Sequence, residues 1–167
     1  MSEQNAIQKA IDFAIATEET GAVTYTELAK RFADKKDLQE AFTMLARDEE
    51  VHKAQFQALM KDIPASAASI ASDDDKIQLL RAMAMSEFFD LEKGPLKTIG
   101  QAQNVQEALR CVLGVEKATL SYYVALQDAI GESKALSGII QSEKQHVTRL
   151  MKYLITDEKM KGLSDPF

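Results

Sequence analysis

Four stretches of this chain repeat apolar residues at intervals of three and four, and each carries a glutamate within its apolar stripe. The stretches run from about residue 3 to 33, from 38 to 59, from 109 to 130 and from 136 to 153. That spacing is typical of one face of an α-helix. The glutamates that share a stripe with apolar residues are Glu18, Glu49, Glu116 and Glu143. Because a buried carboxylate is costly unless it is paired or binds a metal, the four faces are expected to pack so that these side chains meet.

The two histidines of the chain occupy equivalent places in two of these stripes. His52 stands three residues after Glu49, and His146 stands three residues after Glu143. Residues three apart lie on the same side of a helix, so each E-x-x-H places a carboxylate beside an imidazole. One such pair is weak evidence for a metal site, but two pairs within apolar stripes favour one.

The chain also repeats this pattern in its two halves. Glu18 is followed seven residues later by Tyr25, and Glu116 is followed seven residues later by Tyr123. In both halves an E-x-x-H comes after the next turn, which predicts two similar helical hairpins. Tyr25 and Tyr123 are candidates for hydrogen bonds to the ligands of the site, and the alternative is that they are core aromatics.

Turn signals place the glutamates of each hairpin at one level. Asp34 marks the first turn and is the expected N-cap of the second helix, while Gly131 ends the helix before the second turn. With a rise of about 1.5 Å per residue, Glu18 and Glu49 both lie roughly 23 Å from the first turn. Glu116 lies at nearly the same height from the second turn, so the carboxylates are expected to converge.

These signals divide the chain into one domain with four parts. The parts are a first hairpin at about 3–62, a crossover at 63–103, a second hairpin at 104–156 and a tail at 157–167. The crossover holds one expected helix, from about 73 to 92, with Ser72 as its N-cap. Asn104 and Glu107 resemble a capping arrangement for the helix that follows. The expected fold is all-α: an antiparallel four-helix bundle of two hairpins with an extra short helix in a long crossover.

The charge within the bundle is the strongest argument for metal. Neither lysine nor arginine occupies the inner positions of the four stripes, so protons or metal ions must neutralise the four carboxylates. Two divalent cations would balance them. Carboxylate oxygens and imidazole nitrogens suit iron or manganese, and the sequence does not choose between these metals. A polar core network without metal is the alternative.

Composition excludes several other functions. The net charge of −6 and the absence of a dense basic run argue against nucleic acid or an anionic membrane as a partner. No apolar run approaches the roughly 20 residues that span a bilayer, and the first residues lack a leader pattern, so a cytoplasmic location is expected. The single cysteine, Cys111, excludes an internal disulfide and a four-thiolate metal site within one chain.

At these residues the sequence resembles the ferritin-like superfamily, in particular small rubrerythrin-like di-iron proteins, with a ligand pattern closest to bacterioferritin. The resemblance rests on "TEETGAVTYTELA", "RDEEVH", "GVEKATLSYYVAL" and "SEKQH", and it covers both hairpins. It implies two iron ions held by six ligands. Terminal ligands would be Glu18 and Glu116, bridging ligands Glu49 and Glu143, and each iron would be capped by one histidine, His52 or His146.

Two departures from the family pattern carry further expectations. Full-length rubrerythrin has a rubredoxin module with two C-x-x-C pairs, which one cysteine cannot supply, so a separate electron-donor protein is implied. Bacterioferritin has a haem-ligating methionine directly after its first bridging glutamate, where this chain has Glu50. No haem is therefore expected.

The function that the resemblance implies is a non-haem di-iron oxidoreductase that reacts with O2 or hydrogen peroxide, of ferroxidase or peroxidase type. A role in iron handling or oxidative stress would follow, and a homodimer is the expected assembly. Two alternatives stay open. One is a non-catalytic protein that binds or stores iron, and the other is a dimanganese enzyme similar to catalase.

Overall fold

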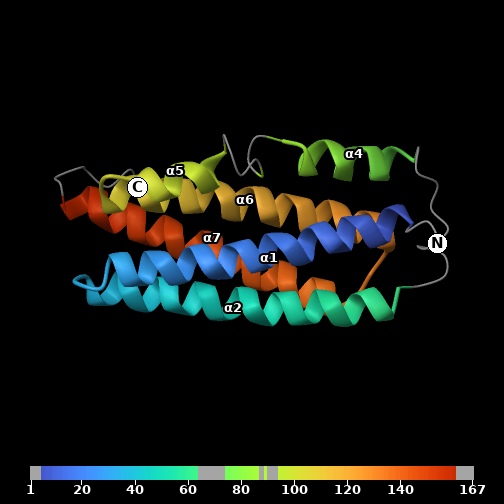
Figure 1. Ribbon diagram of the computed structural model, residues 1–167, viewed down its shortest axis with the longest axis horizontal. Coiled ribbons are helices and arrows are strands. Elements are labelled where there is room, and N and C mark those ends of the chain that lie inside the picture. The colour runs from blue at the N-terminus through green and yellow to red at the C-terminus, as the bar shows by residue number, and fades with distance from the viewer. Residues whose placement is uncertain (1–4, 64–73, 87–88, 90–93, 161–167) are drawn as a thin grey trace.

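The computed structural model describes residues 5–63, 74–86, 89 and 94–160. Its helices are α1 (Ala6–Arg31), α2 (Lys36–Lys61), α4 (Asp75–Ala84), α5 (Pro95–Gln101), α6 (Val105–Ile130) and α7 (Lys134–Met160). The four long helices lie side by side along the length of the molecule (Figure 1). None of the described helices has both the length and the hydrophobicity of a membrane-spanning helix.

The bundle consists of two antiparallel hairpins. Helix α1 packs along α2, and α6 packs along α7, while α2 and α7 form the main contact between the hairpins. The crossover carries the chain from the end of α2 back along the bundle to the start of α6 (Figure 1). Both of its described helices, α4 and α5, rest on α6. The expected all-α bundle with a long crossover is confirmed.

Capping explains where the long helices begin and end. The side chain of Asn5 accepts a hydrogen bond from the backbone N–H of Gln8 at 2.8 Å and starts α1. Asn104 accepts from the N–H of Glu107 at 2.9 Å and starts α6, as expected. Gly131, at a φ of 87°, ends α6 in a conformation that other residues rarely adopt.

Two expected boundaries of the long helices were wrong. Asp34 does not cap α2: its N-cap is Lys35, whose Nζ lies 3.1 Å from the Asp34 carboxylate, so that carboxylate pairs with an ammonium group instead of a backbone N–H. Helix α7 continues to Met160, so the tail expected from residue 157 begins later. The added residues 157–160, "DEKM", contain no glycine or proline to end the helix earlier.

The crossover also differs from the expectation of one helix over 73–92. Helix α4 ends at Ala84, and its N-cap is Asp74, which accepts a hydrogen bond from the N–H of Lys76. The expected cap, Ser72, lies outside the described residues. A second helix, α5, begins at Pro95, beyond the one helix that was expected in the crossover. Proline is favoured at the first helical position because its φ is fixed near the helical value and it needs no N–H partner there.

Two hydrophobic clusters fill the bundle. One contains Ile11, Phe56, Leu126 and Ile139. The other contains Leu28, Phe42, Val112 and Leu150. Along each of the four long helices the buried glutamate falls between residues of the two clusters. The polar residues therefore form a layer in the middle of the bundle, with apolar packing on both sides.

Candidate metal centre

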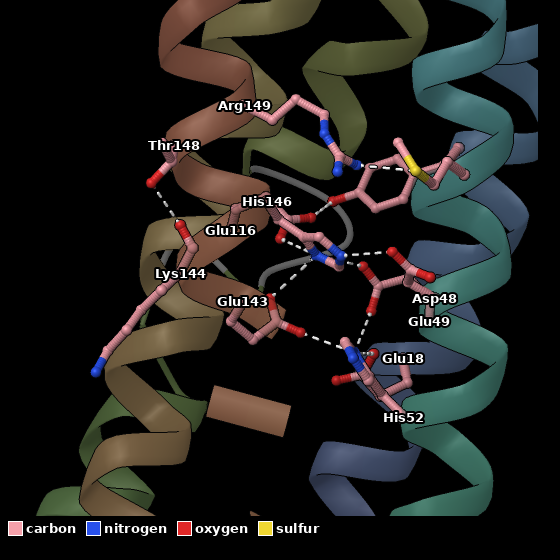
Figure 2. A network of polar contacts seen from close by, with 12 residues as sticks. Glu18, Asp48, Glu49, His52, Glu116, Glu143, Lys144, His146, Thr148 and Arg149 are labelled. Carbon is pink, nitrogen blue, oxygen red and sulfur yellow. Dashed lines mark hydrogen bonds and ion pairs between the residues drawn. The ribbon is translucent and has the colours of Figure 1, made fainter. Parts of the chain in front are cut away.

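The six side chains singled out as metal ligands come together at the centre of the bundle (Figure 2). Helix α1 supplies one glutamate, α6 supplies another, and α2 and α7 each supply an E-x-x-H. Their exposed fractions are Glu143 0%, Glu18 1%, His146 1%, Glu116 2%, Glu49 3% and His52 3%. Such burial is rare for charged residues unless they are paired or bind a metal.

The first group of ligand atoms surrounds the Nδ1 atom of His52. This nitrogen lies 2.9 Å from Glu143 Oε1, 3.4 Å from Glu49 Oε2 and 3.6 Å from Glu18 Oε2. The four residues offer ligand atoms that all lie within 4.8 Å of one another. They could hold one metal ion.

The second group surrounds the Nδ1 atom of His146 in the same manner. This nitrogen lies 3.2 Å from Glu116 Oε2, 3.5 Å from Glu49 Oε1 and 3.5 Å from Glu143 Oε2. These four residues meet the same 4.8 Å criterion. The centroids of the two imidazole rings lie 5.6 Å apart, and each ring belongs to one of the two groups.

Two glutamates belong to both groups. Glu49 directs Oε2 toward His52 and Oε1 toward His146, and Glu143 directs Oε1 toward His52 and Oε2 toward His146. Each carboxylate thus divides its oxygens between two neighbouring positions. Each of these glutamates could therefore contact two metal ions held at these positions.

Several of these ligand atoms have no hydrogen-bond partner in the described part of the chain. The atoms are Glu18 Oε2, Glu49 Oε1, His52 Nδ1, Glu143 Oε1 and Glu143 Oε2. Glu143 Oε1 and His52 Nδ1, both among these atoms, lie 2.9 Å apart. Buried polar atoms are nearly always satisfied, and these converge on the two positions just described. With four carboxylates and two imidazoles, the donor set fits two iron or manganese ions.

Two tyrosines connect the hairpins at this level. The hydroxyl of Tyr25 on α1 donates a short hydrogen bond to Glu116 Oε1 on α6, and the hydroxyl of Tyr123 on α6 donates one to Glu18 Oε1 on α1. Both rings are buried. Each hydrogen bond holds one carboxylate oxygen and leaves Oε2 directed toward its group. The structure thus places both candidate tyrosines against ligands of the site.

One residue in the site was missed by the sequence analysis. Asp48, on α2, places its Oδ2 atom 3.2 Å from Nε2 of His146 (Figure 2). Its side chain is 35% exposed, so it links a buried ligand to the surface. A search restricted to positions that repeat in both halves passes over it, because Ser142 stands in the equivalent place. The need of a ligating histidine for a partner on its second nitrogen is the signal that would have found it.

Burial and mutual repulsion shift the pKa values of the glutamates in the metal-free protein. Burial raises the pKa of Glu49 well above its ordinary value, and the carboxylates of Glu18 and Glu116 raise it further. Burial raises the pKa of Glu116 to about 7, with Glu143 adding to the effect and His146 opposing it. In Glu143 burial acts in the same direction, but the imidazoles around it lower the pKa overall. The cluster therefore retains protons when no cation neutralises it.

Burial has the opposite effect on the pKa values of the two histidines. Burial by itself lowers the pKa of His52, but the carboxylates of Glu143 and Glu18 raise it to about 9. For His146 the carboxylates of Glu116 and Glu143 likewise outweigh burial and raise the pKa to about 11. A metal ion must displace these protons, because only a neutral imidazole can ligate.

The amino-acid sequence that forms this centre matches a known protein family. The profile of the rubrerythrin family matches residues 9–154. The chain belongs to the rubrerythrin family. The resemblance drawn from the sequence is therefore confirmed, and the family together with the buried cluster supports di-iron binding.

A solved structure shows the same fold. It is a protein from Thermotoga maritima described as a ferritin-like diiron-carboxylate protein, with a TM-score of 0.68 and 24% sequence identity to this rubrerythrin family member. The match covers 89% of this chain and 93% of the other. No curated protein matches the chain.

Proposed function

We propose that this member of the rubrerythrin family is a non-haem di-iron oxidoreductase that passes electrons from iron to O2 or hydrogen peroxide. The observation that carries the proposal is the division of Glu49 and Glu143 between two ligand groups. Two carboxylates shared in this way hold two cations as a pair rather than as separate ions. The diiron-carboxylate description of the Thermotoga maritima protein supports the same metal.

Bound ferrous iron would supply the electrons for reduction of the oxidant. The protein residues would fix the ligand geometry and the charge. Glu18 and Glu116, each held at one oxygen by a tyrosine, would keep the other oxygen available. Glu49 and Glu143 have both oxygens in the cluster and can change between chelating and bridging modes as the charge of the site changes.

The burial of the site supports a small oxidant. All six candidate ligands are at most 3% exposed, and hydrophobic clusters pack on both sides of them. A large organic substrate has no contact with such a layer unless the bundle opens. O2 and hydrogen peroxide are small enough to reach it through ordinary side-chain fluctuations.

The test is ferrous iron oxidation under controlled loading. The metal-free protein is loaded anaerobically with two Fe2+ per chain, and the ferric absorption is followed after addition of O2 or peroxide. We expect oxidation faster than in a protein-free control, with saturation at two irons per chain. A rate no higher than the control with both oxidants would refute the enzymatic proposal.

Matched variants connect the reaction to the centre. Glu49→Ala removes a residue common to both ligand groups and is expected to abolish the paired site and the rapid oxidation. Glu19→Ala removes a neighbouring glutamate of α1 whose side chain is 66% exposed, and metal content should stay unchanged. Equal losses in both variants would show that the ligand assignment is wrong. Elemental analysis of protein purified from cells supplied with both iron and manganese distinguishes the two metals, and uptake far beyond two ions per chain would indicate storage.

A further inference from the structure

The two halves of the repeat differ directly before their shared glutamates. Glu49 and Glu143 are equivalent, as are the histidines three residues after them. The residues that precede the two glutamates are different: Asp48 in the first half and Ser142 in the second. A carboxylate therefore precedes the shared glutamate in one half of the repeat but not in the other.

This carboxylate contacts one histidine. Asp48 Oδ2 lies 3.2 Å from Nε2 of His146, while Nδ1 of the same ring faces Glu116, Glu49 and Glu143. A proton on Nε2 that is donated to Asp48 leaves Nδ1 as the free donor for a metal. The contact thus fixes both the orientation of the ring and the nitrogen that can ligate.

His52 has no equivalent support. All of its ion pairs with carboxylates of the described residues are made by Nδ1, to Glu143, Glu49 and Glu18, and none is made by Nε2. The serine at the equivalent position carries no charge. The two imidazoles therefore have the same role in the repeat but different surroundings.

We propose that Asp48 makes the two metal positions unequal, so that the position at His146 binds a divalent cation first and more tightly than the position at His52. A carboxylate that accepts the second N–H of a ligating histidine makes the ring a stronger donor, and losing such a partner typically weakens metal binding by about 10- to 100-fold. Asp48 is in this view a positioning residue that acts through His146. The inference rests on the metal binding that the proposed function requires, but not on the reaction with an oxidant.

The test uses Co2+ alone as the probe, added anaerobically to the metal-free full-length protein. Calorimetry and the visible absorption of Co2+ report the number and strength of the binding steps. We expect two steps that differ by about tenfold or more. His52→Ala should retain the tighter step, and His146→Ala should retain only the weaker one.

Variants of the carboxylate then show whether it causes the difference. Asp48→Ser should weaken the tighter step by about tenfold or more and bring the two steps together. Asp48→Asn keeps an oxygen that can accept the hydrogen bond and should lie between the wild type and Asp48→Ser. Glu50→Ser removes a nearby exposed charge, which contacts Lys53 at 3.0 Å, and should leave both steps unchanged.

A double variant separates action through the ring from a general charge effect. In a His146→Ala background Asp48→Ser should have an effect of less than about twofold, because its partner is absent. The proposal fails if Asp48→Ser weakens the remaining step as much there as in the wild type, or if Glu50→Ser has the same effect as Asp48→Ser. It also fails if the wild-type steps are equal. Two equal Co2+ steps would leave the proposed function intact, whereas no Co2+ binding at all would overturn both.

Discussion

Glu18 and Glu116, the candidate terminal ligands, each place one oxygen against a tyrosine hydroxyl and direct the other toward a histidine of the centre. The hydrogen bonds from Tyr123 and Tyr25 fix the first of these oxygens. Those hydroxyls have raised pKa values, since burial and the nearby carboxylates both disfavour the phenolate. They therefore stay protonated and act as hydrogen-bond donors over the whole physiological pH range.

Removing one tyrosine hydroxyl should weaken the metal position that it supports. We expect Tyr25→Phe to lower Co2+ affinity at the position of Glu116 by about tenfold. Tyr122→Phe is the matched control, because that hydroxyl donates to the backbone oxygen of Ala10 instead of a ligand. Isothermal titration of both variants checks the prediction, and equal affinities would contradict it.

The crowding of carboxylates at Glu49 has a consequence for stability. In the metal-free protein its pKa is raised by burial and by the carboxylates of Glu18, Glu116 and Glu143, so Glu49→Gln should raise the melting temperature of that form. The same change should lower the melting temperature of the metal-loaded form, because a shared ligand is lost. Calorimetry of both forms provides the test, and a lower melting temperature of the metal-free variant would count against the idea.

The raised pKa values also predict how stability depends on pH. In the folded, metal-free protein Glu116 keeps its proton to about pH 7 and His52 to about pH 9, above their ordinary values of 4.5 and 6.5. The folded state therefore binds more protons than the unfolded state across this range, and stability falls as pH rises from about 4.5 to 9. Metal loading should add more stability at higher pH, because fewer protons must be displaced. Urea unfolding at pH 5, 7 and 9, with and without Co2+, measures both trends.

At the scale of elements, the sequence predicted the segments with many buried residues better than the segments with few. The four long helices have stripes of buried apolar residues over many turns, and their pattern predicted both their existence and the faces that meet. The crossover depends on local signals, and there no helix was expected at Pro95, although one begins at that residue. Asp48 escaped prediction because its role depends on where α7 places His146, which the sequence of α2 does not contain.

Glycines within the long helices provide a test of the packing at this scale. A Cβ atom at Gly21 would lie 3.3 Å from Cγ of Glu49, whereas at Gly114 it would meet nothing within 4 Å. Gly114→Ala should therefore stabilise the protein by about 0.5–1 kcal/mol through helix propensity. Gly21→Ala should increase the free energy of unfolding by less than Gly114→Ala does. It should also weaken metal binding, because the added methyl group displaces the side chain of Glu49. Urea unfolding and Co2+ titration of the two variants check this, and equal gains with intact binding would show that α1 and α2 adjust freely.

At the scale of the whole molecule, the centre joins two hairpins that otherwise meet mainly through α2 and α7. Every metal position draws ligands from both hairpins. Loading should therefore stabilise the entire bundle in one transition. At a free metal concentration of 100 times the dissociation constant, the expected gain is about 2.7 kcal/mol for each site.

Removal of the metal tests this coupling directly. A chelator added to the loaded protein should return the melting temperature to that of the metal-free form, and the calorimetric trace should keep a single peak. A second peak, or a melting temperature that does not respond to metal, would mean that the hairpins unfold independently of the centre.

The hydrogen bonds of Tyr25 and Tyr123 also show how the two halves of the repeat depend on each other. Each hairpin carries a glutamate, an E-x-x-H and a tyrosine, but the tyrosine serves the glutamate of the other hairpin. One hairpin alone therefore holds half of a centre, and two identical hairpins related by a two-fold axis would hold a whole one. The arrangement of the two hairpins is thus that of a two-fold dimer joined into one polypeptide, and the candidate metal centre lies at what would be the subunit interface.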